Sequence, residues 1–165
     1  MSSDQRNITN GREIPSHFYA DQPYVVRTDD GAWLSVLTTG EGREGATGQF
    51  VITQRSTDGG LSWTDEVRME EQGAPENSWG VLLKAPSGRL FCFYVYNADN
   101  LRKIEADPGS LAYPDGYCYR VDSLGAYVFR YSDDHGRTWS RDRFTLPVRE
   151  FDIDRDNPTG GSVRY

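Results

Sequence analysis

The feature that most constrains the fold is a short motif that occurs twice in equivalent surroundings. The stretches STDGGLSW and SDDHGRTW, at residues 56–63 and 132–139, repeat a serine, an aspartate, a glycine and a tryptophan at the same spacing, 76 residues apart. Upstream, residues 25–37 resemble residues 82–94, and the turn glycines Gly31 and Gly88 lie 57 residues apart. Because the two offsets differ by 19, the chain repeats one unit whose second copy carries 19 extra residues in its middle.

Each unit is predicted to contain four short β-strands. Branched and aromatic residues alternate with polar ones between turns rich in glycine, aspartate and proline. The expected strands are residues 24–28, 32–38, 49–55 and 66–69 in the first unit, and 79–85, 89–96, 126–131 and 143–146 in the second. Four-stranded units that repeat in this way are typical of propeller blades. The sequence therefore predicts an all-β fold, a β-propeller portion with about two blades and the start of a third.

The repeat divides the chain into four parts. Residues 1–19 are expected to form a flexible leader and residues 20–72 the first blade. Residues 73–149 form the second blade, with an inserted loop at about 97–125, and residues 150–165 begin the next blade. Two blades alone would expose sheet faces and unpaired edges. The expected partners therefore include missing propeller blades or further copies of the chain.

Every shared residue of the repeated motif has a role in holding a turn. An aspartate in a hairpin accepts hydrogen bonds from the backbone of its own turn, and a glycine adopts a positive φ without steric cost. The tryptophan buries a large apolar surface against a neighbouring strand. Structural roles, rather than catalysis, are therefore predicted for Ser56, Asp58, Gly60, Trp63, Ser132, Asp134, Gly136 and Trp139.

These two motifs resemble the Asp box, or BNR repeat, of the sialidase (neuraminidase) superfamily. The resemblance covers roughly residues 20–165 and is that of an amino-terminal portion. It implies a β-propeller with the boxes at the turn between the third and fourth strands of each blade. It also implies a glycoside hydrolase that acts on a terminal acidic sugar, incomplete or inactive as this chain alone. The box itself is shared with propellers of other functions, so it specifies the fold better than the reaction.

The resemblance to active sialidases is weaker at the residues that carry catalysis. Those enzymes resemble one another at a Phe-Arg-Ile-Pro stretch, which aligns with residues 20–23 and puts Asp21 at the arginine position. The loop after the second strand holds glutamates, Glu44 among them, where the family has an aspartate. Asp21 and Glu44 are the candidate catalytic residues that remain. Two alternatives stay open: a polysaccharide lyase on a similar propeller, and a non-catalytic propeller that binds carbohydrate or protein.

Strand connectivity predicts which loops share a surface. In an up-and-down blade the middle turn lies opposite the boxes, at the same end as the connection between blades. The 19-residue insertion belongs to that end, where long loops often carry binding. Amides, carboxylates and aromatic rings there suit the hydroxyls and rings of a carbohydrate or glycan. The predicted contact set is Asp21, Arg43, Trp79, Tyr96, Asn97, Asp99 and Asn100.

Composition excludes several other classes of partner. Acidic residues outnumber basic ones by 25 to 18, and a net charge of -7 argues against nucleic acid. No apolar run approaches the roughly 20 residues that span a membrane, and the polar start lacks a signal peptide, so a cytoplasmic location is the default. The series Asp152, Asp154 and Asp156 lacks the glycine and glutamate of a calcium loop. Neither a metal nor a cofactor is expected.

Overall fold

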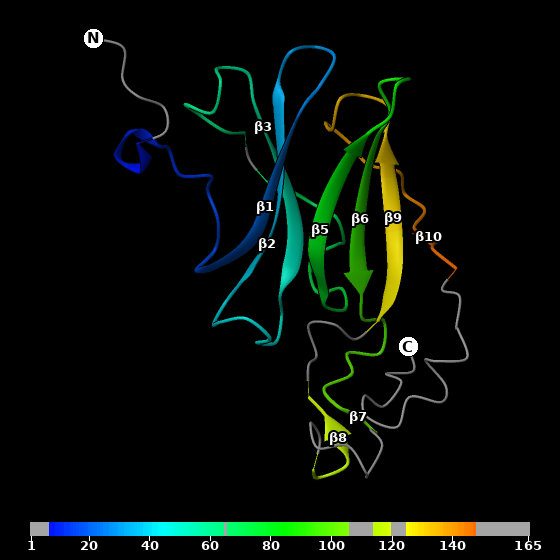
Figure 1. Cartoon of the computed structure of the whole chain (residues 1–165). Coiled ribbons are helices and arrows are strands. Elements are labelled where there is room, and N and C mark those ends of the chain that lie inside the picture. The colour runs from blue at the N-terminus through cyan, green and yellow to red at the C-terminus, as the bar shows by residue number, and fades with distance from the viewer. Residues whose placement is uncertain (1–6, 65, 106–113, 120–124, 148–165) are drawn as a thin grey trace.

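A computed structural model describes residues 7–64, 66–105, 114–119 and 125–147. These residues form two four-stranded antiparallel sheets that pack face to face, with a small two-stranded ribbon below the second sheet (Figure 1). The all-β prediction is confirmed, and each sheet corresponds to one repeat unit. The expected start of a third blade, at residues 150–165, lies outside the described residues.

Both sheets run up and down in chain order. The first sheet has the order β1-β2-β3-β4, with β1 Tyr19–Arg27, β2 Trp33–Gly40, β3 Phe50–Ser56 and β4 Val67–Arg68. The second has the order β10-β9-β6-β5, with β5 Asn77–Lys84, β6 Leu90–Tyr96, β9 Ala126–Ser132 and β10 Phe144–Thr145. The ribbon pairs β7 Ile104–Glu105 with β8 Tyr117–Cys118, and a 3-10 helix, η1, spans Ile8–Asn10.

The first strand of each sheet begins earlier than the sequence predicts. The register of β1 against β2 shifts between Asp21 and Tyr24, and that of β5 against β6 shifts between Ser78 and Val81. Within these bulges Gln22 and Trp79 adopt positive φ angles of 48° and 59°. The two residues are 57 positions apart, which is the repeat offset. A bulge bends a strand without ending it, so the pairing continues upstream to Tyr19 and Asn77.

One end of the expected leader is joined to the first sheet. The backbone N–H of His17 donates to Thr39 Oγ1 at 2.8 Å. That hydroxyl can donate in turn to the carbonyl of His17 or to that of Tyr19. These bonds attach residues 17–19 to the end of β2.

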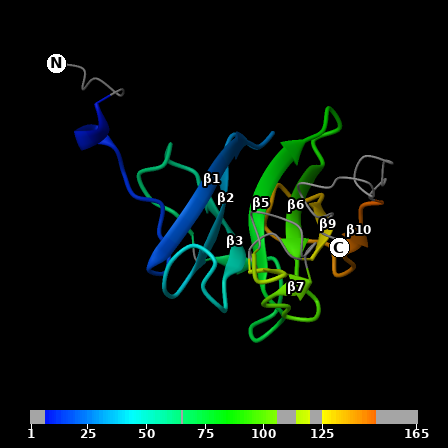
Figure 2. The ribbon, with the colours of Figure 1, turned by 60° about the horizontal axis from the view of Figure 1, so that its bottom comes forward.

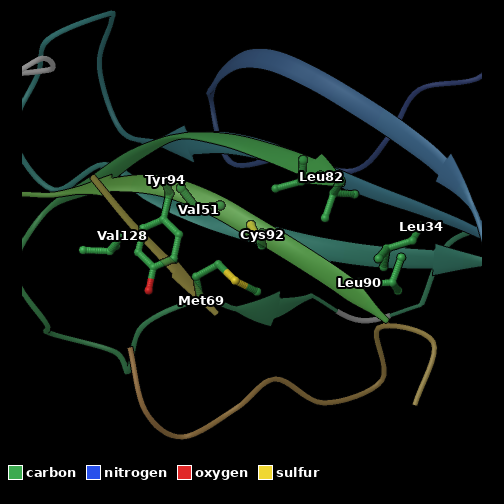
Figure 3. Close-up of a cluster of buried hydrophobic side chains, with 9 residues drawn as sticks. Leu34, Val51, Met69, Leu82, Leu90, Cys92, Tyr94 and Val128 are labelled. Atoms are coloured by element: carbon green, nitrogen blue, oxygen red, sulfur yellow. The ribbon is translucent and has the colours of Figure 1, made fainter. Parts of the chain in front are cut away.

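The hydrophobic core lies between the two sheets (Figure 3). Side chains alternate across each strand, so one face of the first sheet meets one face of the second. The first sheet and the segment that follows it contribute Leu34, Val36, Val51 and Met69, and the second contributes Leu82, Leu90, Cys92, Tyr94 and Val128. All nine side chains are buried, and their contacts join the two repeat units.

Gly80 allows β5 of the second sheet to approach the first sheet closely. A Cβ at this position would lie 2.6 Å from Val36 Cγ2 and 2.7 Å from Val51 Cγ1. Those distances are below van der Waals contact, so any side chain there would push the sheets apart.

The two motif turns make the same hydrogen bonds. Asp58 accepts from the backbone N–H and the hydroxyl of Ser62, at 2.9 and 2.6 Å, and from Ser56 Oγ at 2.8 Å. Asp134 accepts the equivalent bonds from Thr138 and Ser132, at 2.9, 2.6 and 2.7 Å. These bonds, led by that of the Ser62 hydroxyl, lower the pKa of Asp58 to about 2. Each aspartate thus closes its own turn, and both turns lie at the upper end in Figure 1.

Charged residues join the sheets at this same end, which we call the box end. Asp30, in the turn after β1, accepts from Arg55 of the first sheet and from Arg137 in the second motif turn, each at 2.8 Å. Arg55 also donates to the carbonyl of His135. The bond from Thr28, together with these two guanidinium groups, holds the pKa of Asp30 well below its usual value.

Candidate functional site

Three loops gather at the end opposite the motif turns, which we call the loop end. They follow β2 (residues 41–49), precede β5 (residues 70–76) and follow β6 (residues 97–103). Figure 1 shows them at the lower end, and Figure 2 turns that end toward the viewer. The three loops therefore lie at one end of the sheets, as the pattern of strands predicts.

Glu76 joins all three loops. Its carboxylate Oε2 accepts from the backbone N–H of Gly48 at 3.1 Å and from Arg102 Nη1 at 2.7 Å. Its backbone N–H donates to Asn100 Oδ1 at 3.0 Å, and its carbonyl accepts from the N–H of Asn97 at 2.9 Å. A single residue ahead of β5 thus fixes the positions of the loops on both sides of it.

The geometry around Glu76 orients a guanidinium at the surface. The Glu76 side chain is 2% exposed, whereas that of Arg102 is 37% exposed. An arginine has five N–H donors, and the bond from Nη1 to Glu76 occupies one of them. The Arg102 guanidinium therefore keeps donors for a ligand. The second carboxylate oxygen, Glu76 Oε1, is buried and has no hydrogen-bond partner among the described residues. An arginine held in this way can donate hydrogen bonds to a carboxylate or to several hydroxyl oxygens of a ligand.

Two of the predicted contact residues, Asn97 and Asn100, bond to Glu76, and Arg43 lies in the loop after β2. Asn100 bonds to Glu76, and the carbonyl of Arg43 accepts from Gln49 at 2.9 Å while its side chain is exposed. Asn97 is 2% exposed, and its amide bonds to the N–H and the carbonyl of Leu101, at 2.9 and 3.0 Å. Asn97 therefore shapes its own loop in this state.

The other predicted residues lie in different surroundings. Asp21 accepts from the backbone N–H of Gln22 at 2.8 Å, within the bulge of β1. Trp79 occupies the equivalent bulge of β5, and its backbone N–H donates to Thr38 Oγ1 at 2.8 Å. Asp99 and Glu44 are exposed in their loops. The structure gives no geometry that joins Asp21 to Glu44, the two catalytic candidates.

Tyr96 belongs to a second polar cluster between the sheets. The guanidinium of Arg143 lies 3.5 Å from the centre of the Tyr96 ring and donates to Glu70 Oε1 at 2.8 Å. Glu70 also accepts from Arg130 at 3.0 Å and from the Tyr94 hydroxyl. Burial raises the pKa of the Tyr94 hydroxyl, and the Glu70 carboxylate raises it further, so the phenol keeps its proton and donates.

His17 forms a separate pair at the first sheet. Its Nε2 lies 2.6 Å from Glu66 Oε2, and the same glutamate accepts from Arg68 at 3.1 Å. The imidazole is about half exposed and packs at a tilt against Phe50. The pair has the composition of a base with an orienting carboxylate, but it is not joined to Glu76 by any bond between described residues.

The described residues contain neither a cluster suited to a metal ion nor a helix suited to a membrane. No group of three or more histidine, cysteine, aspartate or glutamate side chains there has the arrangement of a metal site. None of the helices in those residues has the length and apolar character needed to cross a membrane.

Glu76 and Arg102 are not among the residues that the sequence predicts for the site. Glu76 stands between Pro75 and Asn77 at the start of an inner strand, and Arg102 follows the tight Asn97 turn. The sequence signal for this pair is an acidic residue at a strand end and a basic residue in the loop after the next strand.

Comparison with known proteins supports the fold. A solved structure of a Hadza microbial sialidase, Hz136, matches with a TM-score of 0.51 and 17% identity, over 74% of this chain and 25% of that one. A protein of unknown function from Dyadobacter fermentans DSM 18053 matches with a TM-score of 0.51 and 16% identity, over 76% and 36%. No family model and no curated protein matches the sequence. The chain spans about a quarter to a third of these structures, and its fold is sialidase-like.

Proposed function

We propose that this chain is part of a sialidase-like glycoside hydrolase and that its loop end contacts a terminal acidic sugar. The sialidase-like fold supports the class of enzyme. The single observation that carries the choice of an acidic sugar is the Arg102 guanidinium, held at 2.7 Å by the buried Glu76 carboxylate.

The chemistry of this arrangement favours an anionic ligand over a neutral one. A guanidinium binds a carboxylate through two parallel N–H bonds, and such charge-assisted bonds are stronger than those between neutral groups. Glu76 holds the arginine in place before the ligand arrives, which reduces the entropy lost on binding. The exposed Arg43 and the amide of Asn100 are the groups we assign to the remaining oxygens of the sugar.

A sugar titration followed by NMR tests the proposal. The unmodified chain is titrated with sialic acid, glucuronic acid and galactose while backbone amide and arginine Nε signals are recorded. Sialic acid is expected to shift Arg102 Nε and the amides of Gly48 and Asn100, with galactose weaker by tenfold or more. Arg102→Gln is expected to remove the response. The control is Arg89→Gln, which removes an arginine from an ion pair at the box end, where both partners are exposed.

Two outcomes would overturn the proposal. Shifts confined to the motif turns at Asp58 and Asp134 would place the ligand at the wrong end. Equal responses to sialic acid and galactose, unchanged in Arg102→Gln, would exclude recognition of the carboxylate by this arginine.

Product analysis on a longer protein that contains this chain separates the reaction classes. A hydrolase releases reducing sugar. A lyase forms an unsaturated product that absorbs in the near ultraviolet. A binding propeller produces neither, and that result together with retained sugar binding would exclude the hydrolase.

A further inference from the structure

Among the residues that the structure describes, the repeat sorts the positive φ angles of residues other than glycine into two groups. In the first group the angle recurs in both units. Gln22 and Trp79 occupy equivalent bulges, and His135, with a φ of 63°, is equivalent to Gly59, whose φ is 74°. Because these angles recur, the blade itself requires them.

Phe18 and Asn100 form the second group, in which the angle does not recur between described residues. Their φ angles are 41° and 48°. Asn100 lies in the loop after β6, where the two units differ in length, and it bonds to Glu76 in the candidate site. The position equivalent to Phe18 in the second unit is Pro75, whose ring restricts φ to about −65°. A left-handed residue just before the first strand is therefore not a requirement of the blade.

Hydrogen bonds to a buried threonine hold Phe18 in its left-handed conformation. The backbone N–H of His17 donates to Thr39 Oγ1 at 2.8 Å, and this hydroxyl lies 2.8 and 2.7 Å from the carbonyl oxygens of His17 and Tyr19. The N–H of Gly40 donates to the carbonyl of His17 at 3.3 Å. Thr39 is fully buried, so both neighbours of Phe18 are fixed to the end of β2. A bulky residue persists at such an angle only where its surroundings impose it.

The conformation presents the Phe18 side chain to solvent. Phe18 is 85% exposed, so its ring gives up the burial by which a phenylalanine normally stabilises a fold. A single exposed apolar residue is common on protein surfaces and needs no explanation by itself. Phe18 differs because its backbone is strained while its ring is exposed, and strained residues cluster at sites that bind ligands.

Phe18 lies on the other side of the loop after β2 from Arg102. It forms a bridge with Gly40, and a Cβ at Gly40 would lie 3.1 Å from the carbonyl oxygen of Gly48. The N–H of Gly48 in turn donates to the Glu76 carboxylate that holds Arg102. Since adjacent strands lie about 4.8 Å apart, these two steps place Phe18 about 10 Å from Gly48. Phe18 and Arg102 thus belong to one end of the sheets but are separated by more than one sugar ring.

We propose that the Phe18 ring is a stacking surface for the sugar that is joined to the terminal acidic sugar. This inference rests on the proposed function, in which Arg102 binds the carboxylate of the terminal sugar. The C–H groups on one face of a neutral sugar such as galactose form an apolar patch, and an aromatic ring offers a large apolar face to such a patch. Specificity for an oligosaccharide over a free acidic sugar then depends on Phe18.

Titration with two ligands tests the role of Phe18. The unmodified chain is titrated with sialic acid and with sialyllactose, in which the same acidic sugar is joined to galactose, while NMR records backbone amide, arginine and Phe18 ring signals. Sialyllactose is expected to bind roughly two- to tenfold more tightly than sialic acid. It is also expected to shift the Phe18 ring and the Gly40 amide, in addition to Arg102. Phe18→Ala is expected to bind the two ligands equally, with its affinity for sialic acid unchanged.

Three further variants separate stacking from stability. Phe18→Tyr retains an aromatic ring and is expected to retain the preference for sialyllactose. Leu61→Ala is the control for the loss of an exposed apolar side chain, because Leu61 is 68% exposed in the first motif turn. Phe18→Gly is expected to lose the preference but to keep the melting temperature. Glycine adopts a positive φ without strain, and this relief offsets the greater freedom of the unfolded chain.

The outcomes distinguish this inference from the proposed function. Binding of sialic acid with no preference for sialyllactose, or a preference that persists in Phe18→Ala, would overturn the inference and leave the proposed function standing. A clear fall in the melting temperature of Phe18→Gly would assign the ring a structural role and overturn the inference as well. Failure of both ligands to bind the unmodified chain would overturn the inference together with the proposed function.

Discussion

Replacing Glu70 by alanine tests how the two sheets are held together. The carboxylate follows β4, its side chain is 6% exposed, and it accepts from Arg130, Arg143 and the Tyr94 hydroxyl. The substitution leaves two partly buried guanidinium groups and a buried phenol without this acceptor. Breaking a buried ion pair on one side costs about 3–5 kcal/mol. For a chain of this length that corresponds to a fall in melting temperature of roughly 6–20 °C.

Glu66→Ala is the matched control for this experiment. Glu66 also accepts from two basic residues, His17 and Arg68, but its side chain is 26% exposed and solvent screens the pairs. Its loss is expected to cost under about 1 kcal/mol. Urea unfolding followed by tryptophan fluorescence, at one protein concentration, gives the free energy of unfolding for each variant. Equal and small losses for Glu70→Ala and Glu66→Ala would refute the reasoning.

Three further predictions concern the motif turns and the isolated chain. Asp134→Ala is expected to lose about 1–3 kcal/mol of unfolding free energy, and Asp58→Ala is expected to lower it as well, which thermal melts measure. NMR is expected to show that the sugar-dependent shifts at the loop end persist in both variants. Both aspartates have a lowered pKa when folded, so their stabilising effect is present above about pH 4 and is lost as the pH falls through the folded pKa, which is about 2 for Asp58. Acid titration of the unmodified chain and of Asp134→Asn measures this loss. The purified 165-residue chain is expected to release no aryl group from an aryl sialoside; sustained release above the blank would contradict this.

The strands were predictable from sequence because their signal is local. Alternating burial follows from a period of two, and the repeat supplied a second copy of each pattern. The starts of β1 and β5 were missed because Gln22 and Trp79 adopt positive φ angles that leave no mark on the sequence. In the structure the two bulges occupy equivalent positions of the repeat, so a bulge in the first strand is a feature of both units.

The pattern of strands predicts the end at which the loops gather but does not select Glu76, and the predicted contact set stays a prediction. Connectivity alone brings the loops to one end, whereas the role of Glu76 depends on partners from three separate loops. Tyr96 could have been placed correctly, since it lies two residues after Tyr94 in β6 and so shares the face that meets the first sheet. Strand alternation was a better guide for that residue than its position beside the loop.

The two ends of the sheets differ in how their hydrogen bonds are arranged along the chain. At the box end Asp58 and Asp134 bond to residues two to four positions away, so each unit can repeat the turn by itself. At the loop end Glu76 bonds across 21 to 28 positions, to three residues of its own unit and to Gly48 of the first, so its geometry depends on the lengths of separate loops. A change in loop length therefore alters the surface at the loop end and leaves the turns at the box end intact. The 19 extra residues of the second unit enter the chain after β6, which ends at the loop end, so that end is where differences in ligand binding among chains of this fold should be sought.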